Sequence, residues 1–182
     1  MPDIIRRNIG GKKVLLLFVV TNIIYAFMLG VTIPKVMSFS GGMKIIDMMP
    51  AGYNSEYVRT LLTALGEKGR ATYLYNQIPV DMIYPLLFAV SYCLTLAYVI
   101  DKLGESDGPL FYVSFLPILA GTFDYCENIG IIRMLNDFPK LSESLVSSTS
   151  LFSVAKSTCT TIYFIILIFS LILLGFKKLK SD

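Results

Sequence analysis

The fold is decided by residues 14–34, which read VLLLFVVTNIIYAFMLGVTIP. These 21 residues carry no charge. About 20 consecutive apolar residues are enough for a helix to cross a hydrocarbon core about 30 Å thick. The stretch is longer than the apolar segment of a secretory signal peptide, which has about 7–15 residues. It therefore predicts a retained membrane-spanning helix rather than a cleaved leader.

Three further apolar runs follow the first one. They cover residues 79–100, 109–132 and 151–176, and an outer loop of residues 35–78 separates the first run from the second. The chain is 54% hydrophobic and 16% charged, with a mean hydropathy of +0.65, whereas a soluble domain has about 25% charged residues. We therefore predict an all-α fold: a polytopic membrane protein with four transmembrane helices in an antiparallel bundle, as one membrane domain over residues 1–182.

The composition also excludes several classes of function. The chain has no histidine, so it has no His-ligated haem or zinc and no catalytic triad built on imidazole. Its net charge of +3 is too small and too dispersed for nucleic-acid binding. Cys93, Cys126 and Cys159 lie inside apolar runs, where cysteine packs as a small apolar residue. We expect no metal site and no cofactor, and membrane lipids rather than nucleic acid as partners.

Basic residues are clustered next to the first and last apolar runs. Cytoplasmic ends of membrane helices are enriched in Lys and Arg, and four crossings place both termini on one side. We therefore expect both termini in the cytoplasm, and the short tails favour the plasma membrane. The clusters consist of Arg6, Arg7, Lys12 and Lys13 before the first run, and of Lys177, Lys178 and Lys180 after the last.

The outer loop contains the signals of one short helix. Asn54 is suited to cap its start, Glu56 lies in its first turn, and Gly66 is suited to end it. Its apolar face predicts an interfacial helix that lies on the bilayer or on the bundle. That face consists of Val58, Leu61, Leu62 and Leu65.

Each apolar run also carries one polar face, formed by residues three or four positions apart. Turned inward, these faces bring ionisable side chains to one level near the outer end of the bundle. The predicted cluster is Asp81, Asp124, Glu127 and Lys156. Its predicted neighbours are the rim residues Arg70 and Arg133, the neutral partners Tyr84 and Asn128, and the tyrosines Tyr73 and Tyr75.

This cluster has two interpretations. An ionisable side chain inside a membrane costs at least about 2.5–3.5 kcal/mol, so it indicates function by default. The alternative is an ion-pair network that only holds helices together, and Lys156 fits that role. Three carboxylates against one lysine leave two excess negative charges, which a bound cation, a rim arginine or protonation must offset.

A proline adds a further candidate feature. Pro85 cannot donate a hydrogen bond to the carbonyl of Asp81. A bare carbonyl beside the Asp81 carboxylate predicts an oxygen-rich spot for a cation or a substrate ammonium, unless neighbouring groups satisfy it. On the third run, Asp124 and Glu127 lie within one helical turn, which suits an acid beside a base.

Short sequence elements resemble those of a family of small four-helix integral membrane proteins without an assigned activity. The elements are GY, LGxxGRxxY, an aspartate before a Tyr-Pro pair, and FDxxEN. The resemblance covers residues 45–135 and supports the choice of site residues, but it implies no chemistry. The matching residues are Gly52, Tyr53, Gly66, Gly69, Arg70, Tyr73, Asp81, Tyr84, Pro85, Phe123, Asp124, Glu127 and Asn128.

Three functions remain open at this point. An outer-facing acidic pocket could bind or transport a cation, an amphiphile or a lipid headgroup, with a homo-oligomer to complete a transport path. A membrane-embedded enzyme could act on a lipid or isoprenoid-like substrate, with Asp124 or Glu127 as catalytic acid or base. A structural or accessory subunit would use the charges only to lock its helices. The expected ligand-binding residues are Asp81, Tyr84, Asp124, Glu127, Asn128, Lys156, Arg70 and Tyr73.

Overall fold

The computed structural model describes residues 2–180, which form helices and, within that range, no strand. The four long helices are α2 (Gly11–Phe27), α5 (Ile78–Leu103), α6 (Leu116–Asp137) and α7 (Glu143–Leu179). The other elements are α1 (Pro2–Arg6), the π-helical turn η1 (Met28–Thr32), α3 (Ile33–Met37), the 3-10 turn η2 (Ile46–Met48), α4 (Ser55–Thr72), the π-helical turn η3 (Tyr73–Gln77) and the 3-10 segment η4 (Pro109–Phe115).

Four helices are long and apolar enough to cross a membrane, as the sequence predicts. They cover Gly11–Met37, Ser55–Leu103, Pro109–Asp137 and Glu143–Leu179. Each contains one of the four predicted runs and extends beyond it. The largest extension precedes the second run, because α4 and η3 lead without a loop into α5.

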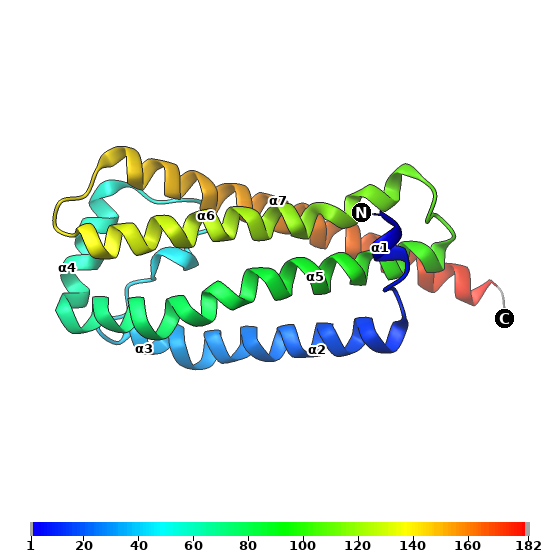
Figure 1. The fold of residues 1–182 in the computed structure, drawn as a ribbon, viewed down its shortest axis with the longest axis horizontal. Coiled ribbons are helices and arrows are strands. Elements are labelled where there is room, and N and C mark those ends of the chain that lie inside the picture. Colours follow the sequence, from blue (N-terminus) through cyan, green and yellow to red (C-terminus); the bar gives the residue numbers. More distant parts are fainter. Residues whose placement is uncertain (1, 181–182) are drawn as a thin grey trace.

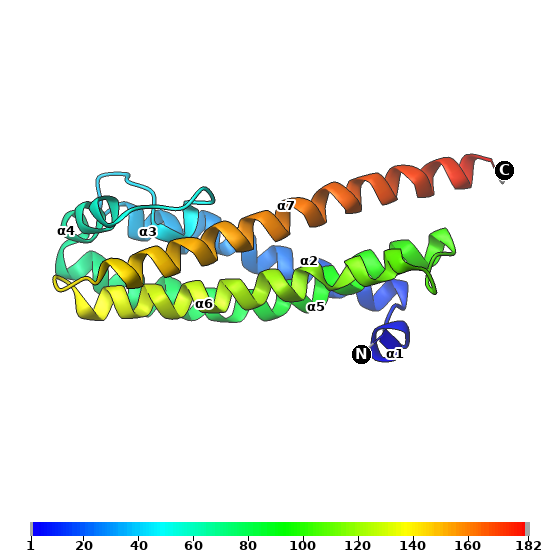
Figure 2. The ribbon, with the colours of Figure 1, turned by 90° about the horizontal axis from the view of Figure 1, so that it is seen from above.

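The four long helices lie side by side along the long axis of the molecule and alternate in direction (Figure 1). α5 is the central helix, because it packs against α2, α6 and α7, whereas α2 and α7 are not packed along each other. α1 and the last turn of α7 lie at the same end, called the terminal end below (Figure 1). Toward this end α7 diverges from α5 and α6 (Figure 2).

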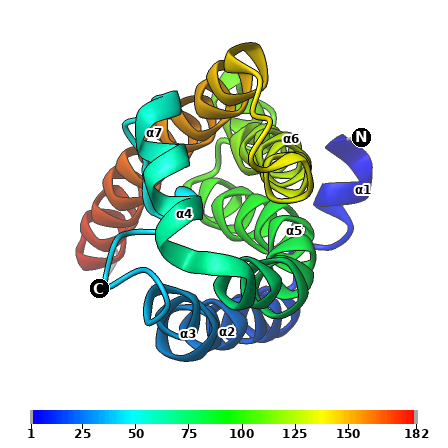
Figure 3. The same cartoon turned by 90° about the vertical axis from the view of Figure 1, so that its left-hand side faces the viewer.

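α4 crosses the opposite end of the molecule, called the α4 end below (Figure 3). Its start is capped as predicted, because the Asn54 side-chain oxygen accepts a hydrogen bond of 2.8 Å from the Tyr57 amide. The regular helix is interrupted at Gly66, where the sequence predicts its end, because Gly66 has a φ of 60°. After this kink the chain continues as a second helical arm through η3 into α5. α4 and the central helix α5 are therefore joined through η3 without an intervening loop.

The apolar face of α4 is turned inward onto the long helices rather than outward. Its side chains, Val58, Leu61, Leu62 and Leu65, belong to a buried cluster that fills the α4 end. A second, aromatic-rich cluster around Tyr92, Phe111 and Tyr163 fills the terminal half. Tyr84 packs against both clusters. The polar residues that the sequence singles out lie at this junction.

Candidate functional site

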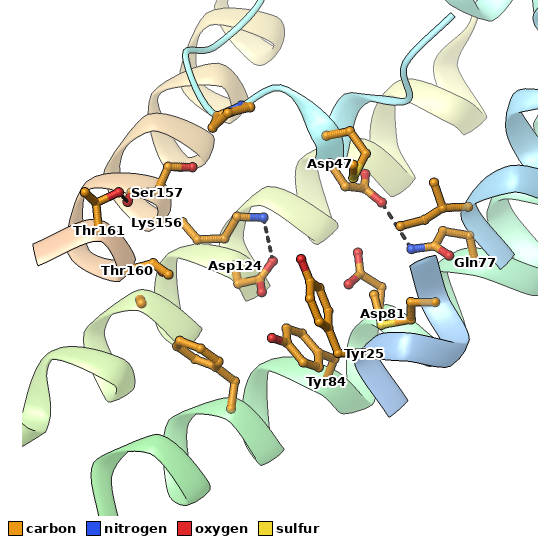
Figure 4. A pocket seen from close by; sticks show the side chains of 16 residues that line it. Tyr25, Asp47, Gln77, Asp81, Tyr84, Asp124, Lys156, Ser157, Thr160 and Thr161 are labelled. Atoms are coloured by element: carbon orange, nitrogen blue, oxygen red, sulfur yellow. Dashed lines mark hydrogen bonds and ion pairs between the residues drawn. The ribbon is translucent and has the colours of Figure 1, made fainter. Parts of the chain in front are cut away.

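A cavity of about 300 Å³ opens at the junction of the two apolar clusters. It is bounded by α2 and η1 on one side, α7 on the other, α5 and α6 behind, and the η2 segment above (Figure 4). Its polar lining residues are Tyr25, Asp47, Gln77, Asp81, Tyr84, Asp124, Lys156, Ser157, Thr160 and Thr161. Its apolar lining residues are Met28, Ile33, Met48, Pro50, Phe88 and Ala120.

On the α6–α7 side of the cavity, the charges are paired. The Lys156 ammonium lies 3.1 Å from an Asp124 carboxylate oxygen (Figure 4) and also forms an ion pair with Glu127. The Ser153 hydroxyl donates a hydrogen bond to the other Glu127 oxygen. Asp124 and Glu127 are one turn apart on α6, and Ser153 and Lys156 are one turn apart on α7, so the two pairs meet face to face. The single lysine is thereby committed to two carboxylates.

Two glycines let α6 approach its neighbours at this level. A methyl group on Gly121 would lie 2.8 Å from the carbonyl oxygen of Pro85 on α5. A methyl group on Gly130 would overlap the side chain of Thr149 on α7. Because both positions lack a side chain, the stretch of α6 between them is held close to α5 and α7.

On the opposite side of the cavity, two further carboxylates have no cation. Asp81 on α5 is 4% exposed, and one of its carboxylate oxygens has no hydrogen-bond partner among residues 2–180. Asp47 on η2 lies next to it (Figure 4) and interacts with it electrostatically. Within the described range, neither carboxylate forms an ion pair with Lys or Arg. On this side of the cavity, therefore, two neighbouring carboxyl groups lack a basic side chain as partner.

Neutral donors hold the Asp47 carboxylate in place. The Tyr73 hydroxyl donates to one oxygen, and the Gln77 amide donates to the other at 3.4 Å. The Gln77 carbonyl in turn accepts a hydrogen bond from the Thr32 hydroxyl. Thr32 comes from η1 and Gln77 from η3, so both π-helical turns contribute to this network. Such turns are common at functional sites, where they re-aim side chains.

The carbonyl that Pro85 leaves without an intrahelical donor is not free. The side-chain amide of Asn128 on α6 donates a hydrogen bond of 3.0 Å to the Asp81 carbonyl. The prediction that this carbonyl is free to bind a cation is therefore wrong, because α6 supplies the missing hydrogen-bond donor. Asn128 is fully buried, and its hydrogen bond links α6 to α5 behind the Asp81 carboxylate.

Aromatic rings form the wall between the two acidic sides. Tyr25 on α2 stacks on Tyr84 on α5, with ring centroids 5.3 Å apart and an interplanar angle of 22°. Tyr84 contacts Phe88 at 5.9 Å, and Phe88 contacts Tyr92 at 4.5 Å. The rings of Tyr25, Tyr84 and Phe88 line the cavity, and their faces carry the partial negative charge that attracts cations.

The structure brings together most of the predicted site residues. Asp81, Tyr84, Asp124 and Lys156 line the cavity. Three others lie one layer behind it and act through a lining residue, namely Tyr73 behind Asp47, Glu127 behind Lys156, and Asn128 behind Asp81.

Three predicted neighbours lie elsewhere. Arg70 donates to the Leu62 carbonyl at 2.8 Å and stacks on the Phe138 ring at 4.7 Å, so it holds the two arms of the bent α4 together. Arg133 lines a separate shallow hollow between α6 and α7. Tyr75 is 73% exposed, because it lies on the face of the helix opposite to the buried Tyr73. No arginine therefore reaches the acidic cluster in the part of the chain that the structure describes.

Asp47 is the residue that the analysis of the sequence missed. It lies in the outer loop, outside every apolar run, and reaches the site because the loop folds back over the cavity. Its flanks gave a signal: the sequence Ile45-Ile46-Asp47-Met48-Met49 places one acid in an apolar stretch, and Ile45 and Ile46 are fully buried. Tyr25 and Gln77 also line the cavity, although they are not among the site residues that the sequence predicts.

The GY element anchors this loop to α7. Gly52 has a φ of 84°, and a methyl group there would lie 2.7 Å from the Ser150 hydroxyl. The Tyr53 amide donates to that hydroxyl at 2.8 Å, and the Tyr53 hydroxyl lies 3.5 Å from that of Ser153. Burial, reinforced by the carboxylates of Glu127 and Asp47, raises the pKa of Tyr53. Its phenol therefore stays neutral beside the acidic cluster.

Comparison with models of known protein families, with curated proteins and with solved structures finds no match to this chain. The geometry of the cavity is therefore the guide to function. That geometry places three carboxylates on the lining, with the only lysine of the described lining already paired. Among the described residues, no group of three or more His, Cys, Asp or Glu side chains is arranged to hold a metal ion.

Proposed function

We propose that the protein is an integral membrane protein whose cavity binds an amphiphile with a positively charged ammonium headgroup. In this proposal α2, α5, α6 and α7 are transmembrane helices of an antiparallel bundle, both termini are cytoplasmic, and the α4 end faces outward. One observation carries the proposal: Asp81 is buried, lines the cavity, and has an unpartnered carboxylate oxygen beside a second unpaired carboxylate, that of Asp47.

The electrostatics favour a cationic ligand. Removing a carboxylate from water is costly unless a partner cation or several hydrogen bonds compensate for it. Asp124 and Glu127 have Lys156 as that partner, but Asp81 has none among residues 2–180. A ligand ammonium beside Asp47 and Asp81 would supply the missing charge. An anionic headgroup would add to the excess.

The lining favours an organic cation over a bare metal ion. Tyr25 and Tyr84 present stacked ring faces, which attract ammonium groups and especially methylated ones. Met28, Ile33 and Phe88 add apolar surface, which would not help to bind a hydrated inorganic ion. An amphiphile satisfies both the acidic and the apolar parts of the lining.

The geometry supports binding more strongly than acid–base catalysis. Glu127 does not line the cavity and is fully buried behind its contacts with Lys156 and Ser153. Asp124 lines the cavity but is already paired with Lys156. A general acid or base must reach the proton that it transfers, directly or through one water molecule. Asp81 is the lining carboxylate with an unpartnered oxygen, and the acid beside it, Asp47, already accepts hydrogen bonds from Tyr73 and Gln77.

The test is a binding experiment on the protein purified in a neutral maltoside detergent. Decyltrimethylammonium is compared with decyl sulfate, which has the same chain length and the opposite charge. Ligand binding to the folded state raises thermal stability in proportion to ligand concentration over Kd, and isothermal titration measures Kd directly. We expect decyltrimethylammonium, but not decyl sulfate, to stabilise the protein.

The deciding variant is Asp81→Asn, which keeps the shape of the side chain and removes its charge. We expect it to weaken decyltrimethylammonium binding at least tenfold. Asp137→Asn makes the same change at an exposed position outside the cavity and should leave Kd within twofold of the unmodified protein. Equal stabilisation by decyl sulfate, or unchanged binding in Asp81→Asn, would show that the proposal is wrong.

A further inference from the structure

The route into the cavity is constrained by what covers it at the α4 end. The η2 segment forms the roof; its first residue, Ile46, and the preceding residue, Ile45, are fully buried. They belong to the apolar cluster that α4 closes with Leu61 and Leu62. A ligand that came from water at this end would have to pass through a packed apolar layer.

The cavity is also closed toward the terminal end. Tyr92 on α5 contacts Phe18 on α2 at 5.4 Å and Phe164 on α7 at 5.7 Å. These three rings bridge the space between α2 and α7 directly below Phe88, and Tyr92 is 5% exposed. The ring bridge therefore forms a floor under the cavity and separates it from the terminal half.

The remaining side lies between α2 and α7, and it is open. Both helices pack on α5 but not along each other. The lining residues on this side are accessible: Tyr25 on α2 is 41% exposed, and Pro50 and Thr161 are also exposed. If α2 and α7 cross a membrane, this opening faces lipid rather than water. Two polar residues of α7, Ser157 and Thr161, line the cavity on this side.

The size of the cavity sets what enters. Ligand pockets that enclose most of a small molecule have volumes of about 300–1,000 Å³, and this one has about 300 Å³. It can hold a headgroup against Asp47 and Asp81 but not a long hydrocarbon tail as well. The tail must leave through the open side.

We propose that the ligand enters sideways from the bilayer through this opening, called the lateral portal, between Tyr25 on α2 and Thr161 on α7. The headgroup docks at Asp47 and Asp81, and the tail remains in the membrane between the two helices. The substrate class is therefore a cationic lipid or lipid-like amphiphile dissolved in the membrane rather than a water-soluble cation. This inference rests on the proposed function and adds the route and the position of the tail.

The position of the tail can be mapped by photolabelling. The probe is a decyltrimethylammonium analogue with a diazirine in the middle of its chain. The protein is placed in phosphatidylglycerol nanodiscs, whose lipid lacks an ammonium group. After illumination, peptide mass spectrometry locates the adducts. We expect them on residues 22–29 of α2 and 157–165 of α7, with loss of labelling in excess decyltrimethylammonium and in Asp81→Asn.

The outcomes separate this inference from the proposed function. Adducts on residues 38–54 or on α4 that excess ligand still removes would overturn the lateral portal and leave cation binding intact. Adducts that neither excess ligand nor Asp81→Asn changes would overturn cation binding itself.

A matched pair of variants tests the portal independently. Thr161→Trp narrows it, whereas Thr158→Trp places the same ring at an exposed position of α7 that does not line the cavity. We expect Thr161→Trp to slow labelling at least fivefold and Thr158→Trp to leave the rate unchanged. Equal rates in both variants would overturn the portal.

Discussion

The two acidic sides of the cavity use the same residue types for opposite purposes. On the α6–α7 side, Asp124 and Glu127 share one lysine, and Glu127 also accepts a hydrogen bond from Ser153. On the side of α5 and η2, Asp81 and Asp47 have neutral donors or none. Neither the residue type nor the depth of a buried carboxylate therefore shows whether it stabilises the fold or binds a ligand. The partners that the fold supplies decide which it is.

Removing the shared lysine should give the largest effect, because it converts the paired side into an unpaired one. We expect Lys156→Met to lower the free energy of unfolding by about 3–5 kcal/mol, the range for breaking a buried ion pair from one side. Thermal unfolding in detergent measures this, with the exposed Lys140→Met as control.

If Lys156→Met does not accumulate, the triple variant with Asp124→Asn and Glu127→Gln provides a second measurement. Because it removes the charges that lost their partner, it should recover much of the stability. Losses of the same size in Lys156→Met and Lys140→Met would show that the ion pairs do not hold α6 to α7.

Glu127→Gln should have the next largest effect and act on stability alone. The amide retains an acceptor for Ser153 but loses the ion pair with Lys156. Hydrogen bonds to charged groups contribute about 1.5–3 kcal/mol, and we expect a loss in that range. Binding of decyltrimethylammonium should remain within twofold, because Glu127 does not line the cavity. Loss of binding with unchanged stability would show that Glu127 serves ligand binding rather than the packing of α6 against α7.

Asp81→Asn should show the opposite profile. Its binding defect is at least tenfold, equivalent to about 1.4 kcal/mol, but its stability should equal that of the unmodified protein or exceed it by about 1 kcal/mol. The reason is that neutralising a buried carboxylate without a cation removes a desolvation cost. Chemical unfolding of the ligand-free protein checks the sign. A drop of several kcal/mol would mean that Asp81 has a structural partner after all.

The smallest effect is expected at the aromatic wall. Exposed cation–π contacts contribute about 0.5–1 kcal/mol, so Tyr25→Leu should weaken decyltrimethylammonium binding two- to fivefold. Tyr25→Phe keeps the ring face and should bind within twofold of the unmodified protein. Because Tyr25 is 41% exposed, neither change should alter stability by more than about 0.5 kcal/mol. Equal binding by Tyr25→Leu and Tyr25→Phe would show that the Tyr25 ring does not contribute to binding.

The four apolar helices could be predicted from the sequence because long uncharged runs have few alternatives. The convergence of Asp81, Asp124 and Lys156 on one cavity follows from helical periodicity. Periodicity could not separate Glu127 from Asp124, because two residues on the same face of a helix can still differ in whether they reach a cavity or a neighbouring helix.

The loop residues could not be placed from local patterns. Asp47 reaches the site through a tertiary fold-back that depends on Gly52 against Ser150 and on contacts with Tyr73. Gly66 interrupts the first helical arm, as its residue type predicts, but the second arm that follows the kink and leads into α5 could not be inferred from the glycine. Tyr73 is buried and Tyr75 is exposed, because residues two positions apart lie on opposite faces of a helix.

The continuity of α4 with α5 has a consequence for how the chain is made. The apolar face of α4 is buried partly by Ile131, Met134 and Leu135 of α6 and by Val146 of α7, and these are synthesised after α5. While the chain is being synthesised, the apolar face of α4 therefore stays only partly covered until α6 and α7 have been made. A chain that ends before α6 leaves part of this surface exposed. Completion of α7 then closes the α4 end.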